Sequence, residues 1–251
     1  MKSDPSTPLR SSADLIRASR DDGKSPALGG TEICVFDAYG TLFDFNSAVA
    51  RHRAAIGPKA DALSEMWRSK QIQYTWLRNG MGAYAKFWQV TGEALDHCLA
   101  VHGIADSGVR DKLMGAYLAL DAFAEVPVML DRLRRAGVRL AILSNGNPEM
   151  LDPMIAASKL ADRFDAVMSV DAAKVFKPDP KVYRLVEARY GVKPSKVCFL
   201  SSNCWDAHGA AHFGFSTVWV NRAGAPNDNL PGALAGQIRD LSHLPALLGV
   251  S

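Results

Sequence analysis

Polar side chains stand directly after several apolar runs of this sequence. Asp37 follows the run at residues 32–36, and polar segments at residues 144–148, 174–180 and 201–206 follow or flank later runs. An ionised carboxylate at the end of a strand can attack carbon and form an ester that water later cleaves. One aspartate after one strand would indicate no more than the cap of a turn. A role for Asp37 as a covalent nucleophile therefore depends on whether the other polar segments lie close to it in the folded chain.

The apolar runs have the length and composition of buried strands. They cover residues 32–36, 138–143, 166–170, 197–200 and 217–220. The later runs alternate with segments of helical periodicity, such as the one that Pro127 opens and Gly137 closes. This alternation predicts a parallel sheet covered by helices. Because ligands bind outside the carboxyl ends of such strands, we expect the four polar segments to converge on one site.

A long interval without a strand-like run separates the first strand from the second, over residues 37–137. A βαβ unit needs only roughly 30 residues, so we expect an inserted helical domain. Its predicted helices cover residues 47–56, 61–78, 83–101 and 106–120, with breaks at Gly57-Pro58, Asn79-Gly80 and His102-Gly103. The predicted division is a flexible leader over residues 1–30, an α/β core over residues 31–45 and 122–251, and a helical cap over residues 46–121.

Composition narrows the class of protein. The chain has 251 residues, of which 48% are hydrophobic and 22% charged, which is typical of a globular enzyme and not of collagen, coiled coils or disordered chains. The formal net charge is +3 and the basic residues are scattered, so no nucleic-acid partner is expected. No apolar stretch approaches the roughly 20 residues of a membrane span. The first 30 residues lack the apolar centre of a secretory signal.

The four cysteines predict a reducing compartment. Cys34, Cys98, Cys198 and Cys204 form no CxxC pair and lie within or beside apolar stretches. Such cysteines are typically small buried hydrophobic residues and not zinc ligands or disulfides. We therefore expect a cytoplasmic protein.

Four motifs carry a resemblance to a known family. They are DAYGTLFD at residues 37–44, LSNG at 143–146, VFKPDP at 175–180 and SSNCWDA at 201–207. In this order they resemble the haloacid dehalogenase superfamily from about residue 32 to residue 220, and the L-2-haloacid dehalogenases more than the phosphatase branch. The segment MWRSKQIQYTWLR at residues 66–78 adds to this resemblance. It implies a Rossmann-like parallel α/β core with an inserted α-helical cap, and a homodimer.

The resemblance assigns the first half of the reaction to three residues. Asp37 would be the nucleophile, and the Thr41 hydroxyl would orient its carboxylate. Lys177 would place a cation beside Asp37 and Asp206, keeping the nucleophile ionised at neutral pH. Considered alone, Thr41 is an ordinary turn residue, and a lysine is usually solvated at the surface.

The second half of the reaction would use the segment after the fourth strand. Ser201, Asn203 and Asp206 would surround the ester and position or deprotonate the attacking water. Asp206 could instead cap the helix that follows. Tyr183 matches a family position that faces the site, although a core tyrosine explains it nearly as well.

Substrate contacts follow from the same resemblance. Ser144 and the backbone amides near Ala38 and Tyr39 would bind the substrate carboxylate, and Asn145 would help to hold the departing halide. The helix opening at Pro148 favours an anion near its first turn. Without the other polar segments, Ser144-Asn145-Gly146 would indicate a plain turn.

The predicted cap supplies further contacts. Arg68 would stabilise the halide as negative charge builds on it, and Trp205 would complete the halide cradle. Phe87 and Ile72 would line an apolar slot for the alkyl group of the substrate. Most helical arginines face water, and aromatic residues at helical spacing are more often simply core.

Tyr39 distinguishes the two branches of the superfamily. Phosphatases place a second aspartate there as an acid and a magnesium ligand, because a hard cation needs oxygen ligands. This chain has an aromatic ring at that position, and Ser202 and Asn203 where those enzymes have a further acid. We therefore expect no metal and no cofactor.

The sequence predicts a metal-free hydrolase that converts short L-2-haloalkanoates to D-2-hydroxyalkanoates and halide, through an ester of Asp37. The alternatives are a magnesium-dependent phosphatase of the same superfamily and a non-catalytic binding protein that keeps the fold. A Ser-His-Asp hydrolase lacks support because the chain has no GxSxG motif.

Overall fold

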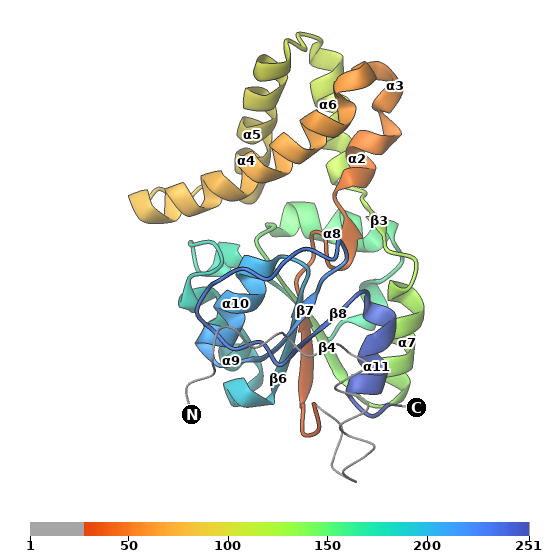
Figure 1. Cartoon of the computed structure of the whole chain (residues 1–251), viewed down its shortest axis with the longest axis vertical. Helices are drawn as coiled ribbons and strands as arrows, with labels where there is room; N and C mark the ends of the chain where they lie inside the picture. The colour runs from red at the N-terminus through yellow and green to blue at the C-terminus, as the bar shows by residue number, and fades with distance from the viewer. Residues whose placement is uncertain (1–27, 251) are drawn as a thin grey trace.

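The computed structural model of the protein describes residues 28–250. Of the predicted leader, residues 1–27 lie outside the described residues. Figure 1 shows a sheet with helices around it and a group of helices, α2 to α6, above one edge. We call the segment from α2 to α6 the helical insert.

Within the described residues, six parallel strands form one sheet in the order β5-β4-β1-β6-β7-β8. The strands are β1 (Ile33–Phe36), β4 (Arg139–Ser144), β5 (Ala166–Ser169), β6 (Val197–Ser201), β7 (Ser216–Val220) and β8 (Gly236–Ile238). Every residue of the central strand β1 is buried, as expected of a strand covered on both faces. The predicted Rossmann-like fold class is confirmed. Strand β8 was not predicted, because Gly236-Gln237-Ile238 is too short to form an apolar run.

Helices cover both faces of the sheet (Figure 1). They are α7 (Val126–Arg135), α8 (Pro148–Ala157), α9 (Pro180–Tyr190), α10 (Cys204–Phe213) and α11 (Leu244–Leu247). Short 3-10 turns lie at Gly57–Lys59, Ala161–Arg163, Val170–Ala172, Pro194–Lys196 and Leu241–His243. Helix α7 begins beside Pro127 and ends before Gly137, whose φ is 76°, so both signals in the sequence mark its ends.

The helical insert lies between two short strands. Its helices are α2 (Asn46–Arg51), α3 (Arg53–Ile56), α4 (Ala60–Met81), α5 (Phe87–His102) and α6 (Ser107–Tyr117). Strand β2 (Phe43–Asp44) pairs antiparallel with β3 (Asp121–Ala122), where the chain leaves the sheet region and returns to it. The division at residues 46 and 121 stays a prediction. Among the helices of residues 28–250, none combines the length and hydropathy needed to cross a membrane.

Three predicted boundaries in the insert were wrong. Helix α4 continues through Asn79 and Gly80 and ends at Gly82, whose φ of 65° places it in the left-handed region. Helix α5 begins at Phe87, four residues later than predicted. The first predicted helix divides at His52 into α2 and α3.

All four cysteines are free thiols. Cys34, Cys98 and Cys198 are buried as predicted, whereas Cys204 is only half-buried in the first turn of α10.

Candidate active site

Three neighbouring strands deliver polar residues to one edge of the sheet. Asp37 follows β1, and its N–H donates to the Leu200 carbonyl of β6 at 2.9 Å. The strands on either side of β1, β4 and β6, end at Ser144 and Ser201. The chain builds the sheet outward in opposite directions from β1, and the crevice at such a switch point is where open α/β sheets bind ligands.

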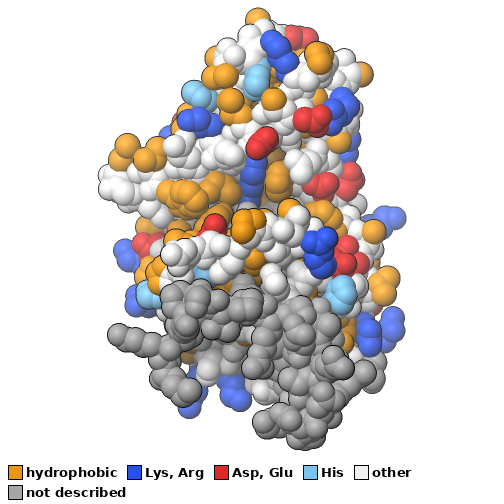
Figure 2. Space-filling view, in the orientation of Figure 1, with side chains coloured by type: hydrophobic (Ala, Val, Ile, Leu, Met, Phe, Trp, Pro, Cys, Tyr) orange, Lys and Arg blue, Asp and Glu red, His pale blue; other side chains and the backbone are white. Residues whose placement is uncertain are grey.

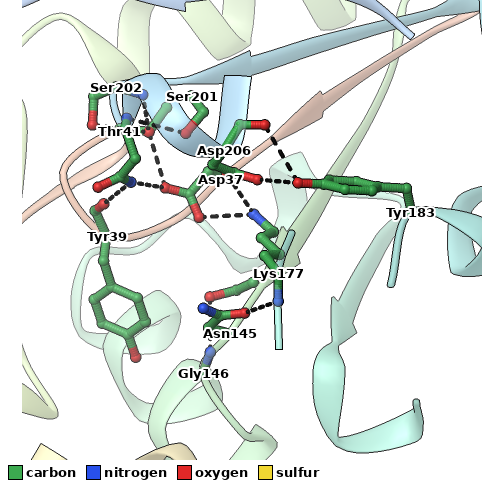
Figure 3. A network of polar contacts seen from close by, with 12 residues as sticks. Asp37, Tyr39, Thr41, Asn145, Gly146, Lys177, Tyr183, Ser201, Ser202 and Asp206 are labelled. Atoms are coloured by element: carbon green, nitrogen blue, oxygen red, sulfur yellow. Dashed lines mark hydrogen bonds and ion pairs between the residues drawn. The ribbon is translucent and has the colours of Figure 1, made fainter. Parts of the chain in front are cut away.

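The Asp37 carboxylate is surrounded by donors, and the residue is only 5% exposed. Its Oδ1 accepts a hydrogen bond from Lys177 Nζ at 3.0 Å, and its Oδ2 accepts from Asn203 Nδ2 at 2.9 Å and Thr41 Oγ1 at 3.2 Å (Figure 3). An ionised carboxylate accepts hydrogen bonds and donates none, so this environment suits the charged form. A carboxylate that is fixed in this way at the end of a strand can act as a nucleophile.

Lys177 bridges two carboxylates in the interior. It is 1% exposed, and its Nζ lies 3.0 Å from Asp37 Oδ1 and 2.9 Å from Asp206 Oδ2. Burial alone would lower the pKa of Lys177, but the charges of Asp206 and Asp37 outweigh it, and the pKa is raised. Lys177 is therefore a buried cation, and the alternative of a solvated lysine is wrong.

Asp206 lies inside the first turn of α10 and is fully buried. The N-cap of this helix is Asn203, so the alternative that Asp206 caps the helix is wrong. Burial raises the pKa of Asp206, although the Lys177 ammonium acts in the opposite direction. A buried carboxylate with a raised pKa is better able to accept a proton from water.

Tyr183 belongs both to the core and to the site. Its hydroxyl donates to Asp206 Oδ1 at 2.8 Å, while its ring packs edge-on against Phe199 with centroids 5.9 Å apart. Helix α10 can approach this hydroxyl only because residue 209 is glycine. A Cβ there would lie 2.7 Å from the Tyr183 oxygen.

Thr41 and Ser202 join the turn after β1 to the turn after β6. The Thr41 hydroxyl donates to Asp37 and accepts from the Ser202 N–H at 2.8 Å. Gly40 permits this contact, because it has a φ of 85° and a Cβ there would meet Ser202 Oγ at 2.8 Å. Ser201 Oγ accepts from the Asn203 N–H at 3.2 Å and so shapes the same turn.

The segment after β4 is tied to residues 173–179, the loop before α9 that carries Lys177. We call residues 173–179 the lysine loop. The Asn145 side-chain oxygen accepts from the Lys177 N–H at 3.0 Å, and Ser144 Oγ accepts from the Gly146 N–H at 3.0 Å. No described residue accepts a hydrogen bond from the N–H of Ala38 or Tyr39. Ala38 and Tyr39 follow β1, and the buried Ser144 ends the neighbouring strand β4, so both segments supply donors at the same edge of the sheet. Backbone N–H groups that are free of protein partners can bind an anion.

Tyr39 contributes its backbone carbonyl and its aromatic ring to the site, and it supplies no acidic group. Its carbonyl accepts from Asn203 Nδ2 at 3.2 Å, and its ring points away from Asp37 in Figure 3. The ring stacks on Tyr117 with centroids 5.5 Å apart and packs against Phe87 at 5.6 Å. Within the described residues, no group of three or more His, Cys, Asp or Glu side chains is placed to hold a metal ion.

The helical insert reaches the site through Arg68. From α4, its Nη2 donates to Asn203 Oδ1 at 3.0 Å, and Nη1 donates to Gln71 Oε1 at 2.8 Å. Asn203 thereby stands between the arginine and the carboxylate of Asp37. Phe87 is buried against the ring of Tyr39, as a wall of an apolar slot would be.

Two predicted residues are not joined to this network. Trp205 packs edge-on against Trp76 of α4, with centroids 5.4 Å apart, and no hydrogen bond or ring contact within residues 28–250 connects it to Arg68 or Asn145. Ile72 is half-buried on the next turn of α4 from Arg68. Hydrophobic side chains gather on the visible face beneath the overhanging part of α4 (Figure 2). The roles of Trp205 and Ile72 in the site stay predictions.

Three residues that contact the network were not predicted. Ser202 bonds to Thr41, Gln71 bonds to Arg68, and Asn79 bonds to the backbone of Phe176, the neighbour of Lys177. A signal for Gln71 exists in the sequence, because its spacing of four from Trp67 places it on the apolar stripe of α4. Asn79 and Ser202 bond to partners distant in the chain, so no local pattern marks them.

Comparisons with known proteins agree with these motifs. The family model of haloacid dehalogenase-like hydrolases matches residues 31–214. The (S)-2-haloacid dehalogenase 4A of Burkholderia cepacia is 47% identical over 216 residues, which are 86% of this chain and 94% of that protein. A solved structure of a dehalogenase with an intermediate complex is 46% identical and matches with a TM-score of 0.86 over 88% of this chain and 98% of that chain. The L-2-haloacid dehalogenase of Xanthobacter autotrophicus with chloropropionic acid covalently bound is 38% identical, with a TM-score of 0.78 over 86% of this chain and 98% of that chain.

Proposed function

Because the chain belongs to the (S)-2-haloacid dehalogenases of the haloacid dehalogenase-like hydrolase family, we propose that it hydrolyses short L-2-haloalkanoates to D-2-hydroxyalkanoates and halide. The observation that carries this proposal is the Asp37 carboxylate, held by Lys177, Asn203 and Thr41 at the end of the central strand. The similar structure with covalently bound chloropropionic acid supports an ester intermediate.

In the first step, a carboxylate oxygen of Asp37 attacks C2 of the substrate. The carbon–halogen bond breaks, its electron pair leaves with the halide, and C2 inverts. The N–H groups of Ala38 and Tyr39 and the Ser144 hydroxyl bind the substrate carboxylate. Asp37 is left as a neutral ester next to the Lys177 cation.

In the second step, water adds to the carbonyl carbon of the Asp37 ester. Asp206 accepts a proton of the water, with Ser201 and Asn203 at its sides. The bond from that carbon to the substrate oxygen breaks, and this oxygen takes the proton from Asp206 to become the 2-hydroxyl group. The Asp37 carboxyl group that forms then loses its proton to solvent. C2 takes no part in this step, so the only inversion is the first one. An L substrate therefore gives a D product, and Asp37 is regenerated.

The remaining groups hold the leaving halide and the alkyl chain. Arg68 and Asn145, with Trp205, form the halide end, and Phe87 and Ile72 face the alkyl group. The contact from Arg68 to Asn203 supports this placement, because it sets the guanidinium beside the nucleophile. The hydrogen-bond donors of Arg68, Asn145 and Trp205 then stabilise the negative charge that develops on the halide.

The chemistry requires no metal in this proposal. The aromatic ring at residue 39 stands where a phosphatase places an acid, and the base for the second step is the Asp206 carboxylate, whose pKa is raised by burial. The rival function, a magnesium-dependent phosphatase, uses the same Asp37 nucleophile.

Halide release from the two enantiomers of 2-chloropropionate tests the proposal. We expect chloride from the L form only, D-lactate as the product, and no effect of EDTA. An Asp37→Asn variant should release none. Phosphate release from p-nitrophenyl phosphate under added magnesium, with no chloride from either enantiomer, would favour the phosphatase.

We also propose that the protein is a cytoplasmic homodimer. The four free thiols support a reducing compartment. The exposed apolar side chains of Trp76, Leu77 and Met81 on α4 support an association through the helical insert. Light scattering coupled to size-exclusion chromatography tests the dimer, and a monomeric mass would contradict it.

A further inference from the structure

Gln71 is a polar residue in an otherwise largely apolar stripe. The buried residues of α4 are Ala60, Leu63, Trp67, Gln71 and Thr75, and Gln71 is 1% exposed. Burying an amide costs free energy unless its donors and acceptors are satisfied. The position of Gln71 on α4 is therefore informative, since an apolar residue would pack on this face without that cost.

The hydrogen bonds of Gln71 determine which way its amide points. The Thr91 hydroxyl donates to the Phe87 carbonyl at 2.7 Å, so toward Gln71 it can only accept, and Gln71 Nε2 donates to it at 2.7 Å. Gln71 Oε1 consequently faces two donors, Arg68 Nη1 at 2.8 Å and the Tyr117 hydroxyl at 3.1 Å. Three helices of the insert thus hold one acceptor against one nitrogen of Arg68.

The side chain of Arg68 also borders a groove, which offers the guanidinium an alternative position. A groove of about 560 Å³ lies there, lined by Arg68 itself and by the acidic residues Asp61 and Glu65, among others. The other nitrogen of the guanidinium reaches Asn203 at 3.0 Å. An arginine released from Gln71 can swing into the groove, toward Glu65 one turn earlier on the same helix.

We propose that Gln71 is the positioning residue that holds the guanidinium of Arg68 toward Asn203 and the leaving halide. The inference rests on the proposed function, in which the electron pair of the carbon–halogen bond leaves with the halide and Arg68 meets that charge. Chloride is a poorer leaving group than bromide and depends more on this stabilisation. Gln71 therefore sets how well the enzyme tolerates the poorer leaving group.

Single-turnover halide release from L-2-chloropropionate and L-2-bromopropionate tests the inference in the full chain. The variant is Gln71→Met, which keeps the length of the side chain, and the control is Gln73→Ala, exposed on the same helix. We expect the rate to fall about a hundredfold for chloride and about tenfold for bromide in Gln71→Met, while KM and the Gln73→Ala rates stay near those of the wild type. Loss of folded protein would lower both rates by the same factor.

A double-mutant cycle assigns the effect to Arg68. If Gln71 acts through Arg68, the bromide-to-chloride ratio of rates in the double variant Arg68→Lys/Gln71→Met equals the ratio in Arg68→Lys alone. If circular dichroism shows that Gln71→Met is unfolded, Thr91→Val is used in its place. This variant removes the acceptor of Gln71 Nε2 and should raise the bromide-to-chloride ratio of rates. An unchanged bromide-to-chloride ratio in the folded variant overturns the inference. A wild type that releases no halide from either substrate instead contradicts the proposed function.

Discussion

Lys177 is a buried cation that lies between two buried carboxylates. Its Nζ lies within 3.0 Å of Asp37 and 2.9 Å of Asp206, and its pKa is raised because their charges outweigh burial. Charges in the interior are stable only when they are paired and hydrogen-bonded. We therefore expect the lysine both to stabilise this edge of the sheet and to hold the Asp37 carboxylate in place.

Replacing Lys177 by methionine should therefore affect both properties. Breaking a buried ion pair by removing one partner destabilises a protein by about 3–5 kcal/mol. We expect Lys177→Met to lower the melting temperature and to reduce kcat by at least about a thousandfold, an effect of the order seen when a catalytic group is removed. Lys174→Met is the control, since that side chain is 61% exposed on the same loop. A folded Lys177→Met variant with near-normal halide release would remove the lysine from the mechanism.

The Tyr183 hydroxyl should control the acid side of the pH profile. Burial raises the pKa of Asp206, and the hydrogen bond from Tyr183 acts in the opposite direction by stabilising the carboxylate. A hydrogen bond to a carboxylate stabilises the charged form of that group. In Tyr183→Phe the pKa of Asp206 should rise further.

In the proposed mechanism, hydrolysis of the ester requires ionised Asp206, so its rate should be lost as the pH falls through the pKa of Asp206. We therefore expect the acid limb of single-turnover ester hydrolysis to lie at a higher pH in Tyr183→Phe than in the wild type, with similar rates on the alkaline plateau. Phenylalanine keeps the ring packing against Phe199. An acid limb at the same pH in both proteins would show that Asp206 is not the base.

The sequence predicts residues of the site where a motif sits at a strand end. Asp37, Ser144 and Ser201 follow directly from that rule, and the structure places them at the ends of three adjacent strands. Gln71 was not predicted, because its position on the apolar stripe of α4 indicates burial but does not identify its hydrogen-bond partners. Its partners Thr91 and Tyr117 lie 20 and 46 residues away.

At the scale of elements, helix α4 connects the insert to the lysine loop. The Asn79 amide bonds both backbone groups of Phe176: Nδ2 donates to the carbonyl at 2.8 Å, and Oδ1 accepts from the N–H at 2.9 Å. Phe176 precedes Lys177, so the last turn of α4 holds the backbone that carries the lysine. The hydroxyl of Tyr84, after α4, adds a bond to Asp171 at 2.8 Å.

Removing the Asn79 amide should disturb catalysis from a distance. Asn79→Ala leaves the two backbone groups of Phe176 without their partner, and a displacement of about 1 Å at Lys177 can cost up to about a hundredfold in rate. We expect kcat to fall by about tenfold or more with little change in KM. Gln73→Ala, exposed on the same helix, should behave as the wild type. Equal kcat values for Asn79→Ala and the wild type would mean that Lys177 is held by its ion pairs alone.

The same residue explains where the prediction of elements failed. Asn79-Gly80 is a typical turn dipeptide, and its pattern predicts the end of a helix. In the folded chain the Asn79 side chain is hydrogen-bonded to the backbone of Phe176 in the lysine loop, and α4 continues to Met81. The strands were predicted well, because helices on both faces of the sheet leave an unbroken apolar run in each central strand. A contact between segments that are distant in the sequence, such as the one from Asn79 to Phe176, produces no local sequence pattern and cannot be predicted in this way.

At the scale of the whole molecule, aromatic rings join the insert to the sheet region. The ring of Tyr39, after β1, lies 5.6 Å from Phe87 and 5.5 Å from Tyr117 of the insert. The ring of Phe87 also packs on Phe176, in the lysine loop, at 6.1 Å. One buried cluster therefore continues from the insert into the core, so the two parts should not unfold independently.

Calorimetry of the full chain should then show a single unfolding transition. Phe87→Ala removes a buried ring from this cluster, which typically costs about 3–5 kcal/mol. Because a chain of this size loses roughly 2–4 °C per kcal/mol, the whole transition should move down by roughly 6–20 °C as one peak. Val101→Ala, an exposed apolar residue of the same helix, should leave the melting temperature within about 2 °C of the wild type. Two separate peaks, of which Phe87→Ala shifts only one, would mean that the insert and the sheet fold as independent units and that the ring cluster merely lies between them.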